Sequence, residues 1–289
     1  MITHPDKVRF PDDGITKGDV AAYYATVAPA MMPHLRRRLI TMERFPNGIG
    51  EKGFIQKDVS KGFPSWLKRF EAPKKGGTVH YPLANDPKSL QWLANQNAIT
   101  LHVWPSRAPR IERPDLCVFD LDPSRDEPDV LRDAMLLLRD VLEELGHASW
   151  VKTSGSKGFH VVVRLPARAT FDDSAALADR VAGILVERRP RALTQAFAKA
   201  ERDGRIYIDT GRNRAGATFA APYTLRPKPG APVSAPCTWS EIEQRAVHPQ
   251  SFTLRTMAER IAQVGDLWQD LTTARPRRPR SASRSGSSE

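Results

Sequence analysis

The sequence predicts an α+β protein whose second half is a ferredoxin-like, or RRM-like, βαββαβ unit. Three observations lead to this prediction. Apolar runs of strand length alternate with helical repeats from Leu116 onward, the first run carries an Asp-x-Asp pattern, and a glycine-rich turn joins two of the runs. A chain of 289 residues, 40% of them hydrophobic, can bury a substantial core. We therefore expect one domain over residues 1–274, with an N-terminal α/β subregion (1–115) and a core with C-terminal elements (116–274).

The elements of the predicted unit follow one another closely. The run Leu116–Asp122 is short enough for a buried strand and is closed by Pro123. Pro128 begins the next helix, whose apolar residues recur at helical spacing up to Leu145, and Gly146 is its expected C-cap. The remaining elements are a strand over 148–153, a strand over 159–165, a helix over 174–188 and a strand over 204–209.

The N-terminal subregion has a less regular pattern. A helix is expected over residues 15–32, because Thr16 can cap it and apolar side chains recur along one face. Pro33 marks the expected end of this helix. Residues 45–115 are rich in Gly, Pro and short mixed segments, which predicts irregular structure and short strands.

The chain carries an excess of positive charge. Its 44 Lys and Arg residues exceed its 33 Asp and Glu residues, and the net charge of +11 predicts an affinity for polyanions, with nucleic acid the leading candidate. The alternative is that surplus arginine is spread over a solvated surface. Residues 275–289 are rich in Arg and Ser and almost lack apolar side chains, so we expect a disordered basic tail. That tail is either a linker remnant or solubilising end, or it makes a nonspecific contact to phosphate or tethers another domain.

Two classes of protein are disfavoured. Cys117 and Cys237 are the only cysteines and lie far apart, so neither a disulfide framework nor a zinc site is supported. No apolar run approaches the roughly 18 residues that cross a bilayer, and the N-terminus has no signal-peptide core. These features predict a cytoplasmic protein.

Carboxylates on the predicted strands indicate a metal site. Asp120 and Asp122 are two residues apart on one strand, so both side chains point to one face while Leu121 points into the core. Adjacent carboxylates repel unless a cation lies between them, and hard oxygen ligands suit Mg²⁺ or Mn²⁺. Asp209, on the neighbouring strand of this topology, is the natural third ligand. Because the two strands run antiparallel, we expect a longer strand or a bulge to bring Asp209 close.

A glycine-rich turn and nearby arginines predict phosphate binding. The turn Ser154–Gly158 joins two strands, its backbone N–H groups can face an anion, and Lys157 adds positive charge. In this topology the turn lies at the same end of the sheet as the Asp-x-Asp pair. At least one of Arg212, Arg214 and Arg226 is expected to hold phosphate oxygens. Carboxylates, two metal ions and a phosphate loop are typical of phosphoryl transfer, and polymerisation fits best.

In this order, these residues resemble the archaeo-eukaryotic primase superfamily, and most closely the polymerase domain of bacterial DNA ligase D. The similarity extends from about Val8 to Trp268. It departs from the usual pattern at Arg212, where the family has a glutamine before the asparagine, and at Pro227, where another basic residue is common. The segments that carry the resemblance are Phe10-Pro11, Ile15-Thr-Lys-Gly-Asp19, Tyr23-Tyr24, Phe54-Ile-Gln-Lys57, Val118-Phe-Asp-Leu-Asp-Pro123, Lys152-Thr-Ser-Gly-Ser-Lys-Gly-Phe-His160 and Ala221-Pro-Tyr-Thr-Leu-Arg226.

The resemblance implies an archaeo-eukaryotic primase fold and a role for each candidate residue. Asp120, Asp122 and Asp209 would bind two catalytic metal ions, Mn²⁺ or Mg²⁺. The substrates would be NTPs or dNTPs, with ribonucleotides preferred. The candidate nucleotide-binding residues are His102, Ser154, Ser156, Lys157, His160, Arg212 and Arg226. Contacts to a DNA 5′-phosphate would come from Lys17 and Lys57, and stacking on the template from Phe63.

By resemblance, the protein would be a bacterial, nucleoid-associated polymerase of nonhomologous end joining that works with Ku and a DNA ligase. It would add nucleotides to a primer 3′-hydroxyl in short gaps that bear a downstream 5′-phosphate. One alternative enzyme is a primase that starts chains de novo. An alternative of another class is a noncatalytic, RRM-like nucleic-acid-binding module. For single residues, Lys17 also fits a solvated position in the first turn of a helix, and Phe63 a loop aromatic packed on the core.

Overall fold

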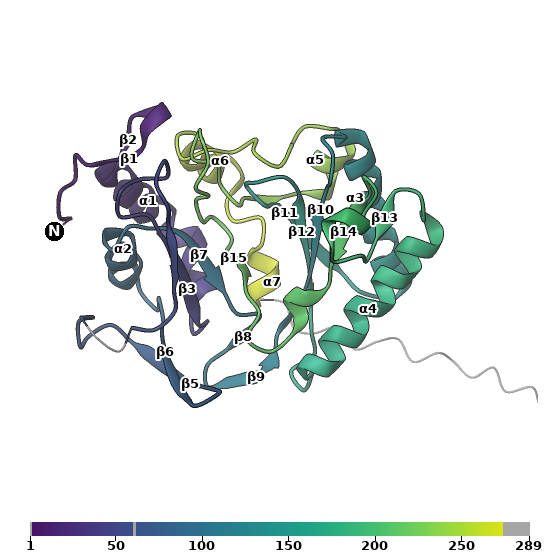
Figure 1. Ribbon diagram of the computed structural model, residues 1–289, viewed down its shortest axis with the longest axis horizontal. Coiled ribbons are helices and arrows are strands. Elements are labelled where there is room, and N and C mark those ends of the chain that lie inside the picture. Colours follow the sequence, from purple (N-terminus) through teal and green to yellow (C-terminus); the bar gives the residue numbers. More distant parts are fainter. Residues whose placement is uncertain (1, 60–61, 274–289) are drawn as a thin grey trace, which may run out of the picture.

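The computed structural model describes residues 2–59 and 62–273. Its two larger β-sheets lie side by side, one assembled mostly from the N-terminal subregion and the other from the second half of the chain (Figure 1). The tail expected over residues 275–289 lies outside the described residues. Within the described part, no helix is long and apolar enough to cross a membrane.

The larger sheet contains the predicted βαββαβ unit, which confirms the expected fold class. Helices α3 (Pro128–Glu144) and α4 (Phe171–Arg188) alternate with its strands. The six strands lie in the order β13 (Leu193–Thr194), β14 (Ile206–Asp209), β10 (Leu116–Asp122), β12 (Phe159–Arg164), β11 (Ser149–Thr153) and β16 (Pro236–Cys237). All neighbouring strands are antiparallel except β13 and β14, which are parallel.

Alternation along β10 directs its side chains to two different cores. Phe119 and Leu121 are buried against α3 and α4 on one face of the sheet. Val118 belongs to a larger core on the opposite face, together with residues of the N-terminal subregion. Asp120 and Asp122 share the face of Val118, because side chains two residues apart on a strand point the same way. The two carboxylates therefore point toward the N-terminal half of the molecule.

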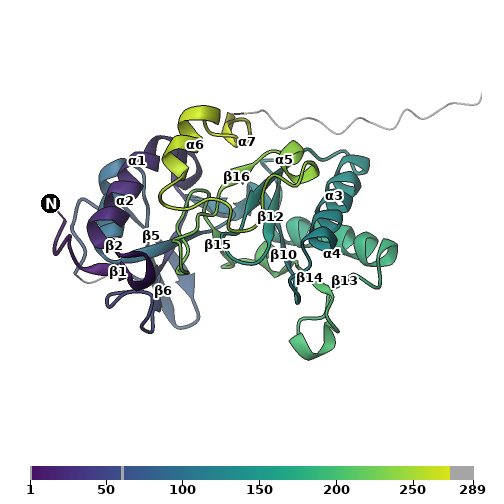
Figure 2. The same cartoon turned by 90° about the horizontal axis from the view of Figure 1, so that it is seen from above.

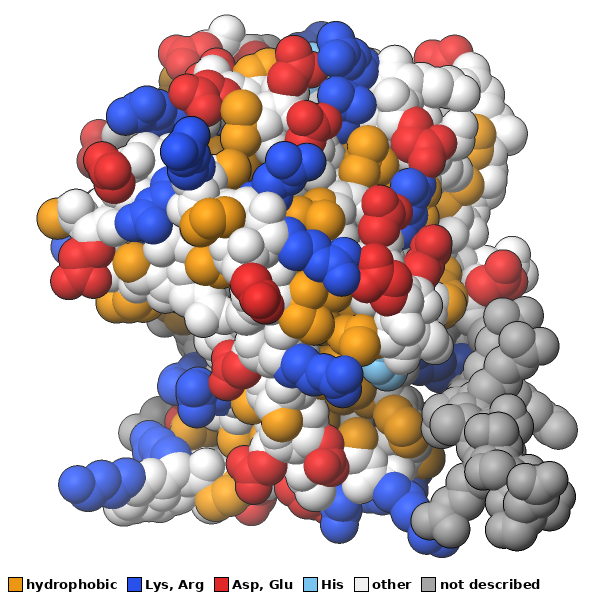
Figure 3. All heavy atoms as spheres, turned by 90° about the vertical axis from the view of Figure 1, so that its right-hand side faces the viewer, with side chains coloured by type: hydrophobic (Ala, Val, Ile, Leu, Met, Phe, Trp, Pro, Cys, Tyr) orange, Lys and Arg blue, Asp and Glu red, His pale blue; other side chains and the backbone are white. Residues whose placement is uncertain are grey.

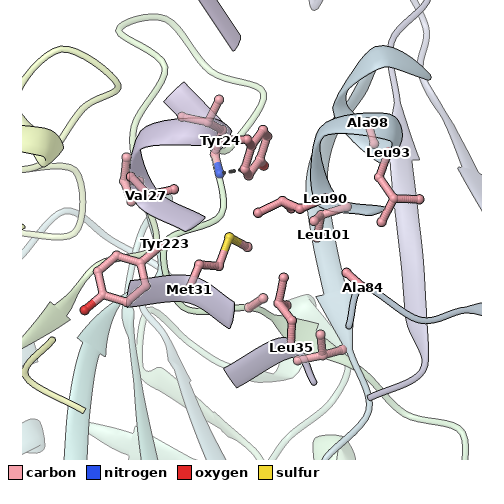
Figure 4. Packing of buried hydrophobic residues seen from close by; sticks show 14 of the residues in the cluster. Tyr24, Val27, Met31, Leu35, Ala84, Leu90, Leu93, Ala98, Leu101 and Tyr223 are labelled. Carbon is pink, nitrogen blue, oxygen red and sulfur yellow. Dashed lines mark hydrogen bonds between the residues drawn. The ribbon is translucent and has the colours of Figure 1, made fainter. Parts of the chain in front are cut away.

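The N-terminal subregion contains the second sheet and two helices. Its strands lie in the order β15 (Phe219–Ala220), β7 (Ala98–Val103), β3 (Ile40–Arg44) and β4 (Phe54–Gln56), so a late segment of the chain completes an early sheet. Helices α1 (Lys17–Leu35) and α2 (Pro87–Asn95) pack on this sheet. Figure 4 shows Tyr24, Met31 and Leu35 of α1 facing Leu90 of α2 and Leu101 of β7.

Short elements connect and cover the two sheets. Figure 2 shows α6 (Met257–Val264) and α7 (Gln269–Thr273) close to α1. Trp268, between these two helices, is buried and donates a hydrogen bond from its indole nitrogen to the carbonyl oxygen of Val151, at 3.0 Å. The C-terminal segment is thereby fixed to the larger sheet. The remaining elements are β1 (Val8–Phe10), η1 (Pro11–Asp13), β2 (Ile15–Thr16), β5 (Arg69–Lys74), β6 (Gly77–Pro82), β8 (Ser106–Arg107), β9 (Arg110–Pro114), η2 (Lys199–Glu201), η3 (Gly211–Asn213) and α5 (Trp239–Glu243).

Two helix boundaries differ from the expectation, and one helix was not expected. Helix α1 runs through Pro33, and the N–H of Arg36 still bonds to the carbonyl oxygen of Met32 at 3.0 Å, so a proline in the last turn does not end this helix. Helix α4 begins earlier than expected because Thr170 forms a capping box. Helix α2 was not expected, although Asp86 caps it and a proline follows at its first position.

Surface charge is mixed on the side of the molecule that lies at the right of Figure 1. Figure 3 shows Lys and Arg side chains interspersed with Asp and Glu on this side. On this side, positive charge is mixed with negative charge and does not by itself mark a binding site.

Candidate active site

Three carboxylates meet where β10 and β14 pair. The two strands are antiparallel, with Asp209 directly opposite Asp120 and Tyr207 opposite Asp122. We expected a longer strand or a bulge to bring Asp209 into place, and this was wrong. β14 has only four residues and pairs with the last three residues of β10 without a register shift, so it ends beside Asp120 rather than beyond it.

Arginines neutralise these carboxylates. The guanidinium of Arg212 lies between Asp120 and Asp209, with its Nη2 at 3.3 Å from Oδ2 of Asp120 and its Nε at 3.2 Å from Oδ2 of Asp209. Arg202 pairs with Asp122 at 3.3 Å. In this arrangement, no group of three or more His, Cys, Asp or Glu side chains among the described residues is spaced to hold a metal ion. The position between Asp120 and Asp209 nevertheless holds a cationic group, and hard oxygen donors converge on it, so the donor set fits a divalent cation.

The turn Ser154–Gly158 lies against the end of β10, as expected. A Cβ atom on Gly158 would be only 1.8 Å from the carbonyl oxygen of Leu121, so glycine is required for this close approach. The hydroxyl oxygen of Ser154 accepts hydrogen bonds from the backbone N–H groups of Ser156 and Gly158, at 3.1 and 3.2 Å. Arg226 crosses the turn and donates to the carbonyl oxygen of Ser154 at 3.1 Å.

His160 links the turn to the carboxylates. It follows the turn on β12, directly opposite Asp120, and its Nε2 is 3.4 Å from Oδ1 of that carboxylate. Burial, together with the charge of Lys152, lowers the pKa of His160 to about 4, so the imidazole is neutral at neutral pH. Burial alone would raise the pKa of Asp120, but His160, Arg212 and Lys152 together hold that pKa well below its usual range. Asp120 is therefore an ionised carboxylate at neutral pH.

The second wall of the site comes from the N-terminal sheet. His102 of β7 lies opposite Ala220 of β15, and its Nε2 is 3.7 Å from a carboxylate oxygen of Glu43 on β3. Burial lowers the pKa of His102, although the nearby carboxylate of Glu43 has the opposite effect. Burial also lowers the pKa of Arg226, whose guanidinium lies near the carboxylate of Glu43.

One cavity of about 320 Å³ unites the predicted catalytic and nucleotide-binding residues. It lies between the two sheets, and four cationic side chains line it beside three carboxylates. Every residue predicted for the metal and nucleotide sites lines this cavity. They are His102, Asp120, Asp122, Ser154, Ser156, Lys157, His160, Asp209, Arg212 and Arg226.

Sequence reasoning missed four residues at this site. Arg202 lies in the stretch between α4 and β14 for which no structure was predicted. Phe197, in the same stretch, lines the cavity and is 82% exposed. Its ring lies nearly perpendicular to that of Tyr207, with the ring centroids 6.4 Å apart. Lys152 is buried behind His160. The alternation of β14 could have identified Tyr207, which is two residues before Asp209 and on the same face.

The three residues predicted to contact DNA lie outside the cavity. Lys17 is buried and donates to the carbonyl and hydroxyl oxygens of Thr3, at 2.7 and 2.9 Å, so it is not the solvated residue of the alternative interpretation. Lys57 is exposed just after β4. Phe63 packs on Trp92 with ring centroids 4.7 Å apart, as the alternative of a loop aromatic on the core expects.

Positive charge surrounds Lys17. Burial lowers its pKa, and the nearby charges of Arg9, Lys7 and Arg44 lower it further. Arg44 also hydrogen-bonds to Gln56, the residue before Lys57. The three basic residues around Lys17 were not singled out from the sequence, because two lie in β1 or before it and one in β3.

Comparison with known proteins identifies the family. The LigD primase-polymerase domain matches residues 16–268. The multifunctional nonhomologous end joining protein LigD of Mycolicibacterium smegmatis is 35% identical over 95% of this chain, which covers 36% of that protein. The bifunctional protein LigD of Bacillus subtilis is 30% identical over 92% of this chain and 43% of its own length. The chain thus spans about a third of the first of these relatives and rather more of the second.

A solved structure agrees with the sequence comparison. The polymerase domain of Mycobacterium tuberculosis ligase D, in complex with DNA, superposes with a TM-score of 0.90 at 33% identity, covering 96% of this chain and 99% of that one. Its fold is the archaeo-eukaryotic primase fold expected above. The chain therefore belongs to the LigD primase-polymerase domain family, whose members are metal-dependent nucleotidyltransferases.

Proposed function

We propose that this protein is a template-directed polymerase that adds NTPs or dNTPs to a primer 3′-hydroxyl in nonhomologous end joining. The observation that carries the proposal is the cavity in which three carboxylates lie beside a glycine-rich turn and four cationic side chains. A noncatalytic nucleic-acid-binding module does not account for clustered carboxylates in a basic site, because they would repel phosphate.

Asp120, Asp122 and Asp209 would hold two divalent cations. The guanidinium between Asp120 and Asp209 supports this assignment, because it marks a position where positive charge is stabilised. When bound, Mn²⁺ or Mg²⁺ would supply Lewis-acid stabilisation of the reacting phosphate. Low pKa values suit ligands of this kind, and Asp120 is held ionised by its neighbours.

The incoming triphosphate would lie on the β12 side of the carboxylates. Lys157, Arg226 and the hydroxyl groups of Ser154 and Ser156 would hold its oxygens. The Ser154 oxygen accepts hydrogen bonds from the N–H groups of Ser156 and Gly158, so its hydroxyl proton would be donated to phosphate. His102 and His160 would contribute neutral N–H donors. The further nucleotide contact is Arg212, which can turn from the carboxylates to phosphate.

The primer would enter on the opposite side. In phosphoryl transfer the attacking and leaving oxygens lie roughly in line, so a pyrophosphate held at the turn places the 3′-hydroxyl toward β14. Phe197 and Tyr207 line the cavity on that side. An aromatic ring with most of its surface exposed is suited to stack on the terminal base of the primer.

Lys17 and Lys57 would bind the 5′-phosphate at the downstream edge of a gap, and Phe63 would contact template. Support comes from the basic groups around Lys17, from the exposure of Lys57, and from the DNA bound to the mycobacterial polymerase domain. Lys17 would have to exchange its contacts with Thr3 for phosphate. We propose Ku and a DNA ligase as partners, because the relatives are named as nonhomologous end joining proteins, the solved neighbour belongs to a ligase, and the relatives are about two to three times longer than this chain.

The test is extension of a labelled primer across a short gap with a 5′-phosphate, with Mn²⁺ or Mg²⁺ and either nucleotide sugar. We expect templated addition that is lost in the Asp120→Asn and Asp122→Asn double variant and kept in Asp126→Asn. Asp126 is an exposed carboxylate four residues beyond the pair, which makes it a matched control. DNA binding without incorporation by the unmodified protein would refute the proposal. Product formed without primer would instead indicate a de novo primase.

A second experiment tests the 5′-phosphate pocket. Gap filling is compared on substrates with and without the 5′-phosphate. Lys57→Ala should abolish the preference for the phosphorylated gap, whereas Lys68→Ala, another exposed lysine, should keep it. An unchanged preference in Lys57→Ala would remove this residue from the pocket.

A further inference from the structure

A lysine is buried in the sheet behind the carboxylates. Lys152 lies on β11 with none of its surface exposed, and the salt bridges among the described residues do not include it. Burial lowers its pKa far below the usual value. A buried amine without a carboxylate partner destabilises a fold unless its hydrogen bonds are well satisfied, so its two polar contacts must account for its presence.

Those contacts lie in one row across the sheet. Lys152 is directly opposite His160, which is opposite Asp120, which is opposite Asp209. The Nζ of Lys152 is 2.7 Å from Nδ1 of His160 and also donates to the hydroxyl of Ser234. Strand pairing therefore fixes the order of lysine, histidine and carboxylate.

The available protons leave one arrangement for this row. Ser234 donates its own hydroxyl proton to the carbonyl oxygen of Thr153, at 2.9 Å, so its oxygen accepts from Lys152. Lys152 is the donor of this row, so the Nδ1 of His160, 2.7 Å from Nζ, accepts a hydrogen bond from it. The ring proton then lies on Nε2, which is 3.4 Å from Oδ1 of Asp120.

We propose that Lys152 is a positioning residue that acts through His160: by donating to Nδ1, it holds the imidazole as the Nε2–H tautomer, aimed at Asp120 and the cavity. The opposite tautomer would turn a nitrogen lone pair toward the carboxylate and repel it. The second ring nitrogen of a histidine commonly sets which tautomer the first one presents. The effect on catalysis rests on the proposed function, but the tautomer itself does not.

The test is ¹⁵N NMR of the metal-free protein labelled at histidine, which distinguishes the two neutral tautomers. The chain has seven histidines, so the signals of His160 are identified as those missing in His160→Gln. The wild-type protein should show His160 as the Nε2–H tautomer. A wild-type His160 protonated at Nδ1 would overturn the proposal without any variant of Lys152, and hence whether or not such a variant folds.

Lys152→Met removes the donor and keeps most of the length of the side chain. It should populate the Nδ1–H tautomer and lower kcat about 10- to 100-fold, with KM for DNA unchanged, because His160 contacts the carboxylate of Asp120 and the loss of an outer partner of a metal site commonly has an effect of this size. Ser234→Ala is the matched control, because it removes the other contact of Lys152 and should keep the Nε2–H tautomer. A folded Lys152→Met variant with wild-type tautomer or wild-type kcat would contradict the proposal.

A double variant separates the route through His160 from a general effect on packing. Lys152→Met should cause little further loss in kcat when His160→Gln is already present, whereas additive losses would overturn the role assigned to Lys152. A wild-type protein that holds the Nε2–H tautomer but extends no primer would overturn the proposed function and support the tautomer assignment.

Discussion

Gly158 provides a direct test of how the phosphate-binding turn and the carboxylates depend on each other. A Cβ atom there would lie 1.8 Å from the carbonyl oxygen of Leu121, whereas real Cβ atoms essentially never approach closer than 3.0 Å. In Gly158→Ala the turn and the end of β10 must therefore separate by more than 1 Å. Leu121 lies between Asp120 and Asp122, and a misplacement of about 1 Å can cost about 100-fold in rate. We expect kcat/KM for nucleotide to fall by about this factor.

The assay is single-nucleotide extension of a primer, with thermal unfolding measured in parallel. Gly183→Ala is the control, because a Cβ at this position in α4 would meet no atom within 4 Å. That variant should keep its rate and gain about 0.5–1 kcal/mol of stability, since alanine favours a helix over glycine. Full activity in a folded Gly158→Ala variant would refute the reasoning, because the turn would then not set the position of the carboxylates.

Three further variants test other contacts. Phe197→Ala should raise KM for the primer-template about 10-fold with unchanged stability, since stacking on a base contributes about 1–3 kcal/mol; an unchanged KM would exclude stacking on the primer. Asp115→Asn should lower the free energy of unfolding by about 3 kcal/mol, at the low end for a broken buried pair, because Arg38 keeps 3% of its side chain exposed but Asp115 keeps 38%. Burial alone would raise the pKa of Asp115, but Arg38 and Arg107 hold that pKa below its usual value. The stabilisation is therefore present above about pH 4 and disappears as the pH falls. Denaturant titrations in which the difference in unfolding free energy between wild type and variant does not change with pH would contradict this. Trp268→Ala should cost about 3–5 kcal/mol, and two separate thermal transitions instead of one would argue against a single domain.

Local periodicity was sufficient to predict the βαββαβ unit and the common face of Asp120 and Asp122. Those predictions depend only on the alternation of side chains along a strand. The place of Asp209 depends instead on register, which is set by the connection that precedes β14 and by the partner strand. Tyr207 of β14 pairs with Asp122 and Asp209 pairs with Asp120, so a short strand already places Asp209 next to the other two carboxylates.

The second wall of the cavity could not be predicted from local pattern. His102 is separated from Asp120 in the sequence by other strands, and β15 joins the N-terminal sheet from more than 100 residues away. Only the resemblance to a family indicated that His102 belongs to the site. The environment of Lys17 was hidden for the same reason, because Thr3 and Arg44 reach it from other segments.

Lys152 illustrates why the chemistry of a sheet depends on what covers its second face. In the sequence Ser-Trp-Val-Lys-Thr of β11, alternation places Val151 toward α3 and α4 and directs Lys152 to the other side, where a lysine would ordinarily be solvated. The N-terminal sheet covers that side, and the ring of Phe219 lies 5.9 Å from the Nζ of Lys152. A residue that looks like surface charge thus becomes a buried donor. Because the hydrogen bond between Lys152 and His160 is buried away from solvent, it is strong enough to determine the tautomer of His160.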